Sequence, residues 1–340
     1  MNIRFKIFLL IITIVIAGSY FFLRSLIFVD SLVILLGLSV VLLFIFMNKL
    51  LRQTNWYKNQ FLDSEKFHKE FPHDIEICNL GSNSGKFAFA YNDTIVKGEN
   101  WAVGPQSFSY DFQVLKNYFS YLKDGGIVLI TMCPLGSCLR DYPGEQVNIK
   151  YYPILDSSLI VNYSHIINLR YVHYPVLSTP MAIRFLIRDV PSDDRLLLST
   201  NPMNSEEIEQ DADNWINGWK NQFSIPDLNS EIVSKENQSA IEYNTKLLSD
   251  MIDFCIVRNL KPILVLPPVT KSLRSKFSEI FLELYVYSFI RNANSRNIKV
   301  LDYFDDIRFM DSDLYFNSFF MNSKGRKLFT NYVLKDIQLS

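Results

Sequence analysis

The chain has 340 residues and a formal net charge of -1, and 49% of its residues are hydrophobic while only 20% are charged. This length suits one large domain with appendages, and the apolar excess is unusual for a soluble protein. The charge balance gives no reason to expect nucleic acid as a partner, because phosphate binding needs a basic face and no such cluster follows the N-terminal region.

Two apolar stretches open the chain, at residues 5–23 and 31–47. Each is long enough for a helix to cross about 30 Å of hydrocarbon, so we predict a transmembrane hairpin within residues 1–50 and a membrane as partner. No cleavage site follows the first stretch, which argues against a signal peptide. Lys and Arg flank both outer ends and favour a cytoplasmic domain, but Arg24 in the link weakens this inference. A first stretch lying in the interface would place the domain outside.

Residues 51–73 are polar and predict a partly helical juxtamembrane linker before a domain at 74–340. Apolar runs predict strands at 75–80, 101–103 and 127–132, with a helix at 108–122 that Asp124 and two glycines end. Further runs predict helices from residue 237 and at 272–292, strands at 261–269 and 298–301, and a last helix from residue 323, which Asn322 caps. Strands alternating with helices indicate an α/β domain with a parallel sheet.

Residues 133–236 break this alternation. The stretch is too long for a simple connection in a compact α/β domain, so we interpret it as an insertion that forms a lid or a binding surface. Trp215 and Trp219 are four residues apart within it, a spacing that places both on one helix face. They would either stack on sugar rings or pack the insertion against the core.

The four cysteines, Cys78, Cys133, Cys138 and Cys255, do not have the spacing of a zinc or thioredoxin motif, and the sequence holds only four histidines. We expect free thiols packed as small apolar residues, with neither a metal nor a cofactor. A disulfide is the alternative if the domain faces the outside of the cell.

Residues 75–89 read IEICNLGSNSGKFAF and lead from a strand through a Gly/Ser/Asn turn into a segment that predicts a helix from Lys86. Open α/β folds place their chemistry at such a junction, because backbone amides and short polar side chains converge there. The sequence therefore predicts a site at this turn.

With these elements, residues 74–330 resemble the SGNH/GDSL hydrolase superfamily, and more closely its membrane-anchored branch that works on cell-envelope polymers. Gly81-Ser82-Asn83 is similar to the nucleophile turn of that superfamily, residues 100–104 to the block whose glycine, here Gly104, helps form the oxyanion hole, and residues 317–325 to its Asp-x-x-His block. The resemblance implies a three-layer, flavodoxin-like parallel sheet and esterase or O-acyltransferase activity on a glycan or a polyol phosphate.

The catalytic triad of this family is substituted. The positions of its serine, aspartate and histidine read Asn83, Asn317 and Phe320, whereas the mechanism needs a hydroxyl, a carboxylate and an imidazole. Loss of a triad removes roughly six orders of magnitude in rate, so ordinary triad hydrolysis is not expected. Ser82 or Ser84 would be the nucleophile in a slipped alignment, with His165 or His173 of the insertion as base.

We therefore take Ser82, Asn83, Ser84 and Asn317 as candidate catalytic residues, and Gly81 and Gly104 as candidate oxyanion or substrate-binding residues. The leading hypothesis is a membrane-tethered esterase or acyltransferase with a degenerate site. The alternative is a catalytically inactive module that binds a glycan or a membrane partner with the same cleft. An unrelated α/β transferase is a third.

Overall fold

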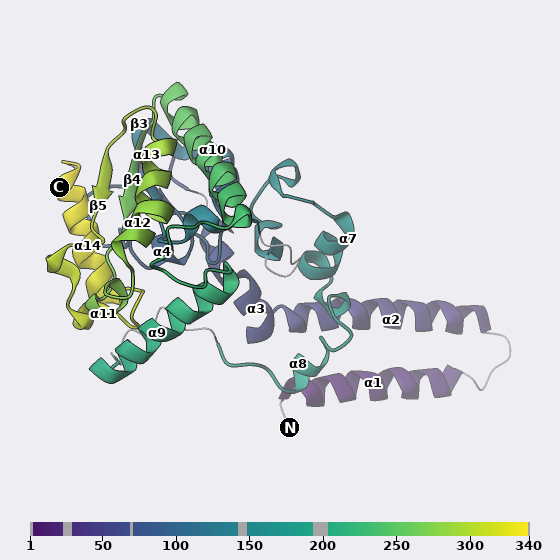
Figure 1. Ribbon diagram of the computed structural model, residues 1–340. Helices are drawn as coiled ribbons and strands as arrows, with labels where there is room; N and C mark the ends of the chain where they lie inside the picture. The colour runs from purple at the N-terminus through teal and green to yellow at the C-terminus, as the bar shows by residue number, and fades with distance from the viewer. Residues whose placement is uncertain (1–2, 23–28, 69–70, 142–147, 193–202, 339–340) are drawn as a thin grey trace. The chain divides into compact units, whose positions relative to one another are not determined.

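The computed structural model describes residues 3–22, 29–68, 71–141, 148–192 and 203–338. They belong to two compact units, which we describe separately (Figure 1). The first unit comprises Met1–His68 and Gly144–Asp193, and the second comprises Lys69–Pro143 and Asp194–Ser340. Arg24 and most of the predicted link between the apolar stretches lie outside the described residues.

The first unit begins with two apolar helices, α1 (Ile3–Phe22) and α2 (Val29–Leu51). Among the described residues, only Val33–Leu51 is a helix long and apolar enough to cross a membrane, while the apolar part of α1, Lys6–Tyr20, is shorter. One apolar helix that could span a membrane is therefore present near the N-terminus. The second span of the predicted hairpin stays a prediction.

Short helices complete the first unit. They are α3 (Asn55–Phe61), a 3-10 helix at Leu62–His68, short 3-10 turns at Ile149–Tyr151, Ser157–Leu159 and Pro175–Leu177, α7 (His165–Ile167), a π-helical turn at Asn168–His173 and α8 (Arg184–Ile187). Phe61 of α3 packs against Ile149 and Ile167, and Leu51 of α2 packs against Phe185. Residues expected to form a linker thus share a small apolar core with part of the predicted insertion.

The second unit is built on a five-stranded parallel sheet, which confirms the predicted α/β class. Its strands are β1 (Ile75–Leu80), β2 (Gly98–Asn100), β3 (Leu122–Thr131), β4 (Lys261–Leu266) and β5 (Val300–Asp302), in the order β2-β1-β3-β4-β5. This is the strand order of flavodoxin-like sheets, in which the order reverses between β1 and β3. Ligands bind at that reversal, beyond the carboxyl ends of the strands.

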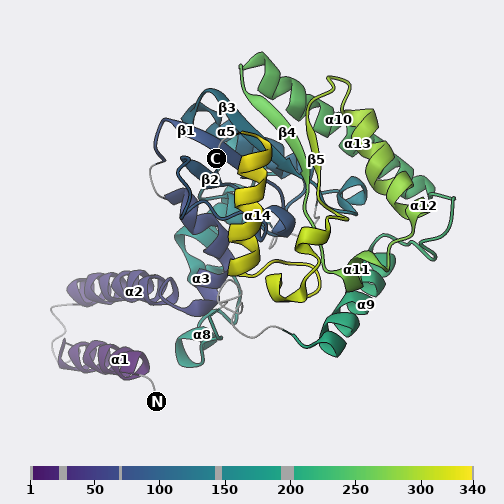
Figure 2. The same ribbon diagram turned by 90° about the vertical axis from the view of Figure 1, so that its left-hand side faces the viewer.

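Helices cover both faces of this sheet (Figure 2). One face carries α5 (Phe108–Tyr118), α10 (Lys235–Val257), α12 (Glu279–Leu282) and α13 (Ser288–Ala293), and the other carries α14 (Ser323–Asp336). The core under α14 joins Leu129 and Val265 of the sheet to Phe329 and Val333 of the helix. Helix α9 (Ser205–Gln222), from the predicted insertion, also belongs to this unit.

Several predicted boundaries are wrong. Strand β3 already begins at Leu122, so Asp124 and the two glycines lie inside it, and Gly125 has a φ of +70° that a glycine adopts easily. Strand β2 ends just before the predicted strand 101–103, which nevertheless continues along β1 because the Trp101 N–H donates to Asn79 O. The helix predicted at 272–292 is broken into α11 (Lys271–Arg274), α12, a π-helical turn and α13.

The segment from Lys86 does not start a helix. Helix α4 (Asn83–Lys86) ends there, and Phe89 and Tyr91, two residues apart, are both buried in the core beside α14. The rings of Phe89 and Phe329 lie 5.4 Å apart. Asn322 caps α14 as predicted, because its side chain accepts a hydrogen bond from the Gly325 N–H at 3.0 Å.

Candidate functional site

A cavity of about 230 Å³ lies at the carboxyl edge of β1 and β3 in the second unit. Polar side chains form one part of its wall: Ser82, Asn83, Ser84, Gln106, Asp111, Thr131, Cys133 and Gln222. Aromatic side chains form another: Phe108, Trp215, Trp219, Phe223, Phe319 and Phe320. The cavity coincides with the strand-order reversal where this class of sheet binds ligands.

Two glycines shape the turn that follows β1. Gly81 has a φ of +123°, and a Cβ there would lie 2.9 Å from the Thr131 Cβ. Gly85 lets α4 approach the strand ends, because a Cβ on it would lie 2.5 Å from the Leu80 carbonyl oxygen. The turn therefore requires glycine at both positions to present Ser82 and its neighbours to the cavity.

Three of the predicted site residues, Ser82, Asn83 and Ser84, line the cavity. The Ser82 hydroxyl oxygen accepts a hydrogen bond from the Gln106 N–H at 2.9 Å. The Asn83 carboxamide rests on Gly104, where a Cβ would lie only 1.7 Å from its Oδ1. The space above Gly104, the candidate oxyanion glycine, is thus filled by an amide of the chain itself.

Asp111 is a cavity residue that sequence reasoning missed. It lies in the first turn of α5 and is only 3% exposed. Its carboxylate accepts hydrogen bonds from the Gly81 N–H, at 2.7 Å, and from the Gln106 side-chain amide. Burial raises the pKa of Asp111 to about 7, against the opposing effect of these two hydrogen bonds. The signal in the sequence was an acidic residue between two aromatic ones in an amphipathic helix.

Residues at the end of β3 complete the polar wall. Burial raises the pKa of the Cys133 thiol, against the opposing effect of hydrogen bonds that involve the Ser84 side chain and the backbone of Leu135 and Gly136. The Thr131 hydroxyl is buried and has no hydrogen-bond partner among the described residues. All four cysteines are free thiols.

The loop that resembles the Asp-x-x-His block carries structural contacts instead of a proton relay. Asn317 does not line the cavity, and its Oδ1 accepts hydrogen bonds from the backbone N–H groups of Phe319, at 3.0 Å, and Phe320, at 2.7 Å. Phe320 packs with Trp215, their ring centroids 5.5 Å apart. The Ser318 hydroxyl donates to Asp211 of α9 at 2.5 Å, which ties the loop to that helix.

Helix α9 holds the aromatic wall in place. Trp219 is 8% exposed and its ring centroid lies 5.1 Å from that of Phe319, so packing accounts for much of its surface. Lys276 forms ion pairs with Glu209 and Asp213 on α9, the second at 2.8 Å. Trp215 and Trp219 therefore pack the helix against the unit, as one of the two alternatives predicted, and they also line the cavity, while stacking on sugar rings stays a prediction.

The second unit supplies no histidine that could act as a base at the cavity. Its only histidine is His73, which stacks on Tyr121 at 4.8 Å between ring centroids. His73 precedes β1, and a six-residue strand spans about 20 Å, so it lies at the opposite edge of the sheet from the cavity. His165 and His173, considered as bases, belong to the first unit.

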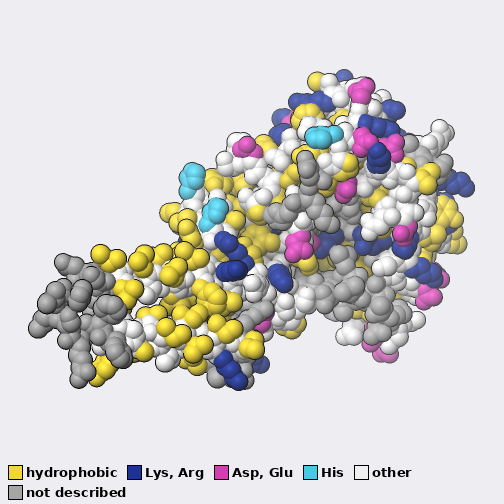
Figure 3. Space-filling view, turned by 180° about the vertical axis from the view of Figure 1, so that it is seen from behind, with side chains coloured by type: hydrophobic (Ala, Val, Ile, Leu, Met, Phe, Trp, Pro, Cys, Tyr) yellow, Lys and Arg dark blue, Asp and Glu magenta, His cyan; other side chains and the backbone are white. Residues whose placement is uncertain are grey.

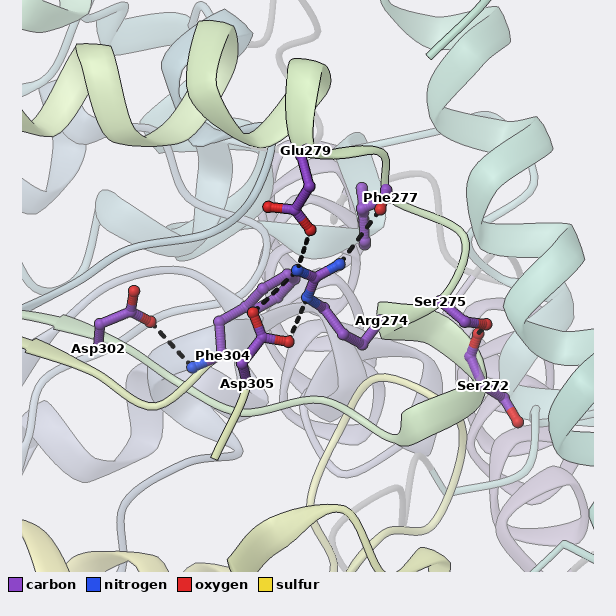
Figure 4. A network of polar contacts seen from close by, with 8 residues as sticks. All are labelled: Ser272, Arg274, Ser275, Phe277, Glu279, Asp302, Phe304 and Asp305. Atoms are coloured by element: carbon purple, nitrogen blue, oxygen red, sulfur yellow. Dashed lines mark hydrogen bonds and ion pairs between the residues drawn. The ribbon is translucent and has the colours of Figure 1, made fainter. Parts of the chain in front are cut away.

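A second polar cluster lies beyond β4 and β5 and is shown in Figure 4. The Arg274 guanidinium bonds to Glu279 at 2.7 Å and to Asp305 at 2.8 Å, and it also lies over the Phe304 ring. Asp302, whose pKa burial raises, accepts a hydrogen bond from the Phe304 N–H at 2.9 Å. The ion pairs of Arg274 with Glu279 and Asp305 fasten α11 to the start of α12 and to the loop after β5, so we assign the cluster a structural role.

No protein-family model matches the sequence, and a search of curated proteins finds no match. Among the residues that the structure describes, no three His, Cys, Asp or Glu side chains converge as a metal site would require. The chemistry of the cavity is therefore argued from its own geometry.

Proposed function

We propose that the second unit is an SGNH-like domain that binds a glycan or another hydroxyl-rich envelope polymer in its cavity, and that α1 and α2 tether it to a membrane as two spans. One observation carries this proposal. The cavity sets the aromatic rings of Trp215 and Phe320 against the hydroxyl and carboxamide groups of Ser82, Asn83 and Gln106. Aromatic faces that stack on sugar rings, combined with a few polar groups that bond their hydroxyls, are the elements that such recognition needs.

The SGNH-like assignment is supported by the position of the cavity within the sheet. The strand order is flavodoxin-like, the turn after β1 supplies Ser82 and Asn83, and Gly104 faces that turn from the connection after β2. These are the places at which the sequence resembles the family.

Binding is favoured over triad hydrolysis because each substituted position has another contact. Asn83 covers Gly104, the Asn317 amide oxygen accepts two backbone hydrogen bonds, and Phe320 belongs to an aromatic cluster. None of these groups can transfer a proton at neutral pH, which the triad mechanism requires of its base.

The test is a binding titration of the full chain in detergent against acetylated and unmodified oligosaccharides of envelope polymers. Trp215→Ala removes a stacking face and is expected to weaken affinity by about tenfold, which corresponds to ~1.4 kcal/mol. Tyr243→Ala is the matched control, because Tyr243 is an aromatic residue 43% exposed on α10 and does not line the cavity. Equal affinities for both variants, or no binding by the folded parent, would refute the proposal.

Acyl transfer or ester hydrolysis is the second candidate function, and Asp111 favours it. A carboxyl group with a pKa of about 7 can accept and return a proton near neutrality, and it shares the cavity with Ser82 and Ser84. An esterase assay on a generic acetyl ester, with Ser82→Ala, Ser84→Ala and Asp111→Asn in parallel, tests this function. Turnover by the parent that one serine substitution and Asp111→Asn both abolish would establish it. No turnover by a parent that still binds glycan, or parent turnover that these substitutions leave unchanged, would exclude it.

A further inference from the structure

The first unit exposes apolar side chains along residues 165–188, the part of the predicted insertion that contains α7 and α8. Six of them are between 41% and 67% exposed: Ile166, Leu169, Leu177, Met181, Ile183 and Ile187. Figure 3 shows hydrophobic side chains gathered along the N-terminal helices and continuing onto the neighbouring part of this unit, with Lys and Arg beside them. Such a contiguous apolar surface marks a site of interaction.

Contacts with the C-terminal part of α2 fix the position of this surface along the axis of that helix. The rings of Tyr174 and Phe44 lie 5.2 Å apart, and the Val176 N–H donates to the Asn48 side chain at 2.9 Å. Leu51, the last residue of α2, packs against Phe185 of α8. All three contacts involve the final two turns of the apolar helix, which is where a helix of this length leaves the hydrocarbon layer.

The same surface carries positive charge and aromatic residues. Arg184 and Arg188 are exposed on and beside α8. A cavity of about 380 Å³ within this unit is lined by Arg184, Trp56 and Tyr171 together with Thr179. Among the described residues beside α8, the acidic one is Asp189, and its carboxylate accepts hydrogen bonds from the backbone N–H groups of Asn55 and Trp56.

We propose that residues 165–188 form an interfacial surface that lies in the headgroup layer of a membrane and binds anionic phospholipids. The exposed apolar side chains enter the acyl boundary, as in amphipathic segments that lie in the plane of a membrane. Arg184 and Arg188 bind lipid phosphates, Trp56 and Tyr171 occupy the level at which aromatic belts form, and the cavity beside Arg184 takes a headgroup. This inference rests on the proposed tether, because it needs α2 in the bilayer.

The experiment attaches an environment-sensitive fluorophore to single added cysteines in the full chain. Met181→Cys probes the surface, Leu42→Cys probes the 65% exposed face of α2, and Ser158→Cys is an exposed polar position of the same unit. The parent chain, treated identically, gives the background from its own four thiols, of which three are buried. Vesicles of phosphatidylcholine with phosphatidylglycerol carry nitroxide-labelled lipid as quencher.

We expect the labels at positions 181 and 42 to be quenched and the label at 158 to remain bright. Quenching at 42 alone would overturn this inference and leave the tether intact, and quenching at neither position would overturn both. Arg184→Glu combined with Arg188→Glu should lower quenching at 181 in phosphatidylglycerol vesicles by more than in pure phosphatidylcholine. An equal effect in the two vesicles would refute the assignment of the arginines to anionic headgroups.

Discussion

Replacing Asp111 with Asn removes the one carboxyl group of the cavity wall while keeping an oxygen for the Gly81 N–H. In the parent protein burial raises the pKa of this carboxyl from 3.8 to about 7. Well below pH 3.8 the carboxyl is protonated in both the folded and the unfolded state and adds no pH dependence. As the pH rises, the unfolded chain releases this proton while the folded protein retains it, so the parent loses stability until the pH passes the folded pKa.

The magnitude follows from the shift. About three pH units at ~1.4 kcal/mol per unit give a loss of roughly 4 kcal/mol between pH 4 and pH 8. Because other carboxyl groups titrate over the same range, the informative quantity is the difference between the parent and Asp111→Asn. We expect the free energy of unfolding of the variant, relative to that of the parent, to increase by this amount as the pH rises.

Urea unfolding of the full chain in detergent, followed by tryptophan fluorescence at a series of pH values, measures this difference. Three of the four tryptophans, Trp101, Trp215 and Trp219, report on the second unit. Glu236→Gln, an exposed carboxyl on α10, is the control and should follow the parent. A difference between Asp111→Asn and the parent that stays constant from pH 4 to pH 8 would refute the assignment of a raised pKa to Asp111.

Three further predictions concern the frame of the cavity. Gly85→Ala should lower the free energy of unfolding by more than ~2 kcal/mol through overpacking. Gly218→Ala, on an open face of α9, should raise the free energy of unfolding by up to ~1 kcal/mol, and urea unfolding compares the two variants. Asn317→Ala should destabilise the protein by about 1 kcal/mol in the same measurement, whereas Asn317→Asp keeps the turn and gains no esterase activity. Lys276→Ala breaks the ion pairs to α9 and should accelerate hydrogen exchange there, while exchange in the sheet is unchanged.

The central strands could be predicted from the sequence because burial on both faces produces continuous apolar runs. Strand β1 has the predicted limits, β4 falls within its predicted segment, and β3 overlaps the predicted 127–132 but begins at Leu122 and ends at Thr131. The break in the 272–292 segment was missed because it depends on side-chain capping. Helix α11 ends at Arg274, and Ser278 starts α12 as its N-cap by accepting a hydrogen bond from the Phe281 N–H at 3.0 Å. Apolar periodicity cannot detect such a restart.

The turn of the site was predictable, but its surroundings were not. Gly81 and Gly85, spaced by serine and asparagine after an apolar strand, indicate a tight turn. In the structure Ser82 of this turn lines the cavity. Asp111 meets Gly81 only because α5 packs over the end of β1, a contact across thirty positions. Helical spacing alone gave Asp111 no partner, so the carboxyl group of the cavity wall was overlooked.

The proposed SGNH-like assignment puts two of the triad positions at Asn317 and Phe320, and the contacts of these residues favour the binding of a ligand over its cleavage. Asn317 fixes the turn that presents Phe320, and Phe320 packs with Trp215 on α9. An imidazole at position 320 would bring ring nitrogens into this aromatic cluster, where an unsatisfied polar group costs about 1–3 kcal/mol. A histidine at position 320 would therefore remove part of the aromatic wall before it created a proton relay. On the proposed SGNH-like assignment, a proton relay and the present aromatic wall therefore exclude each other at position 320, at the cavity beside the switch point of the sheet.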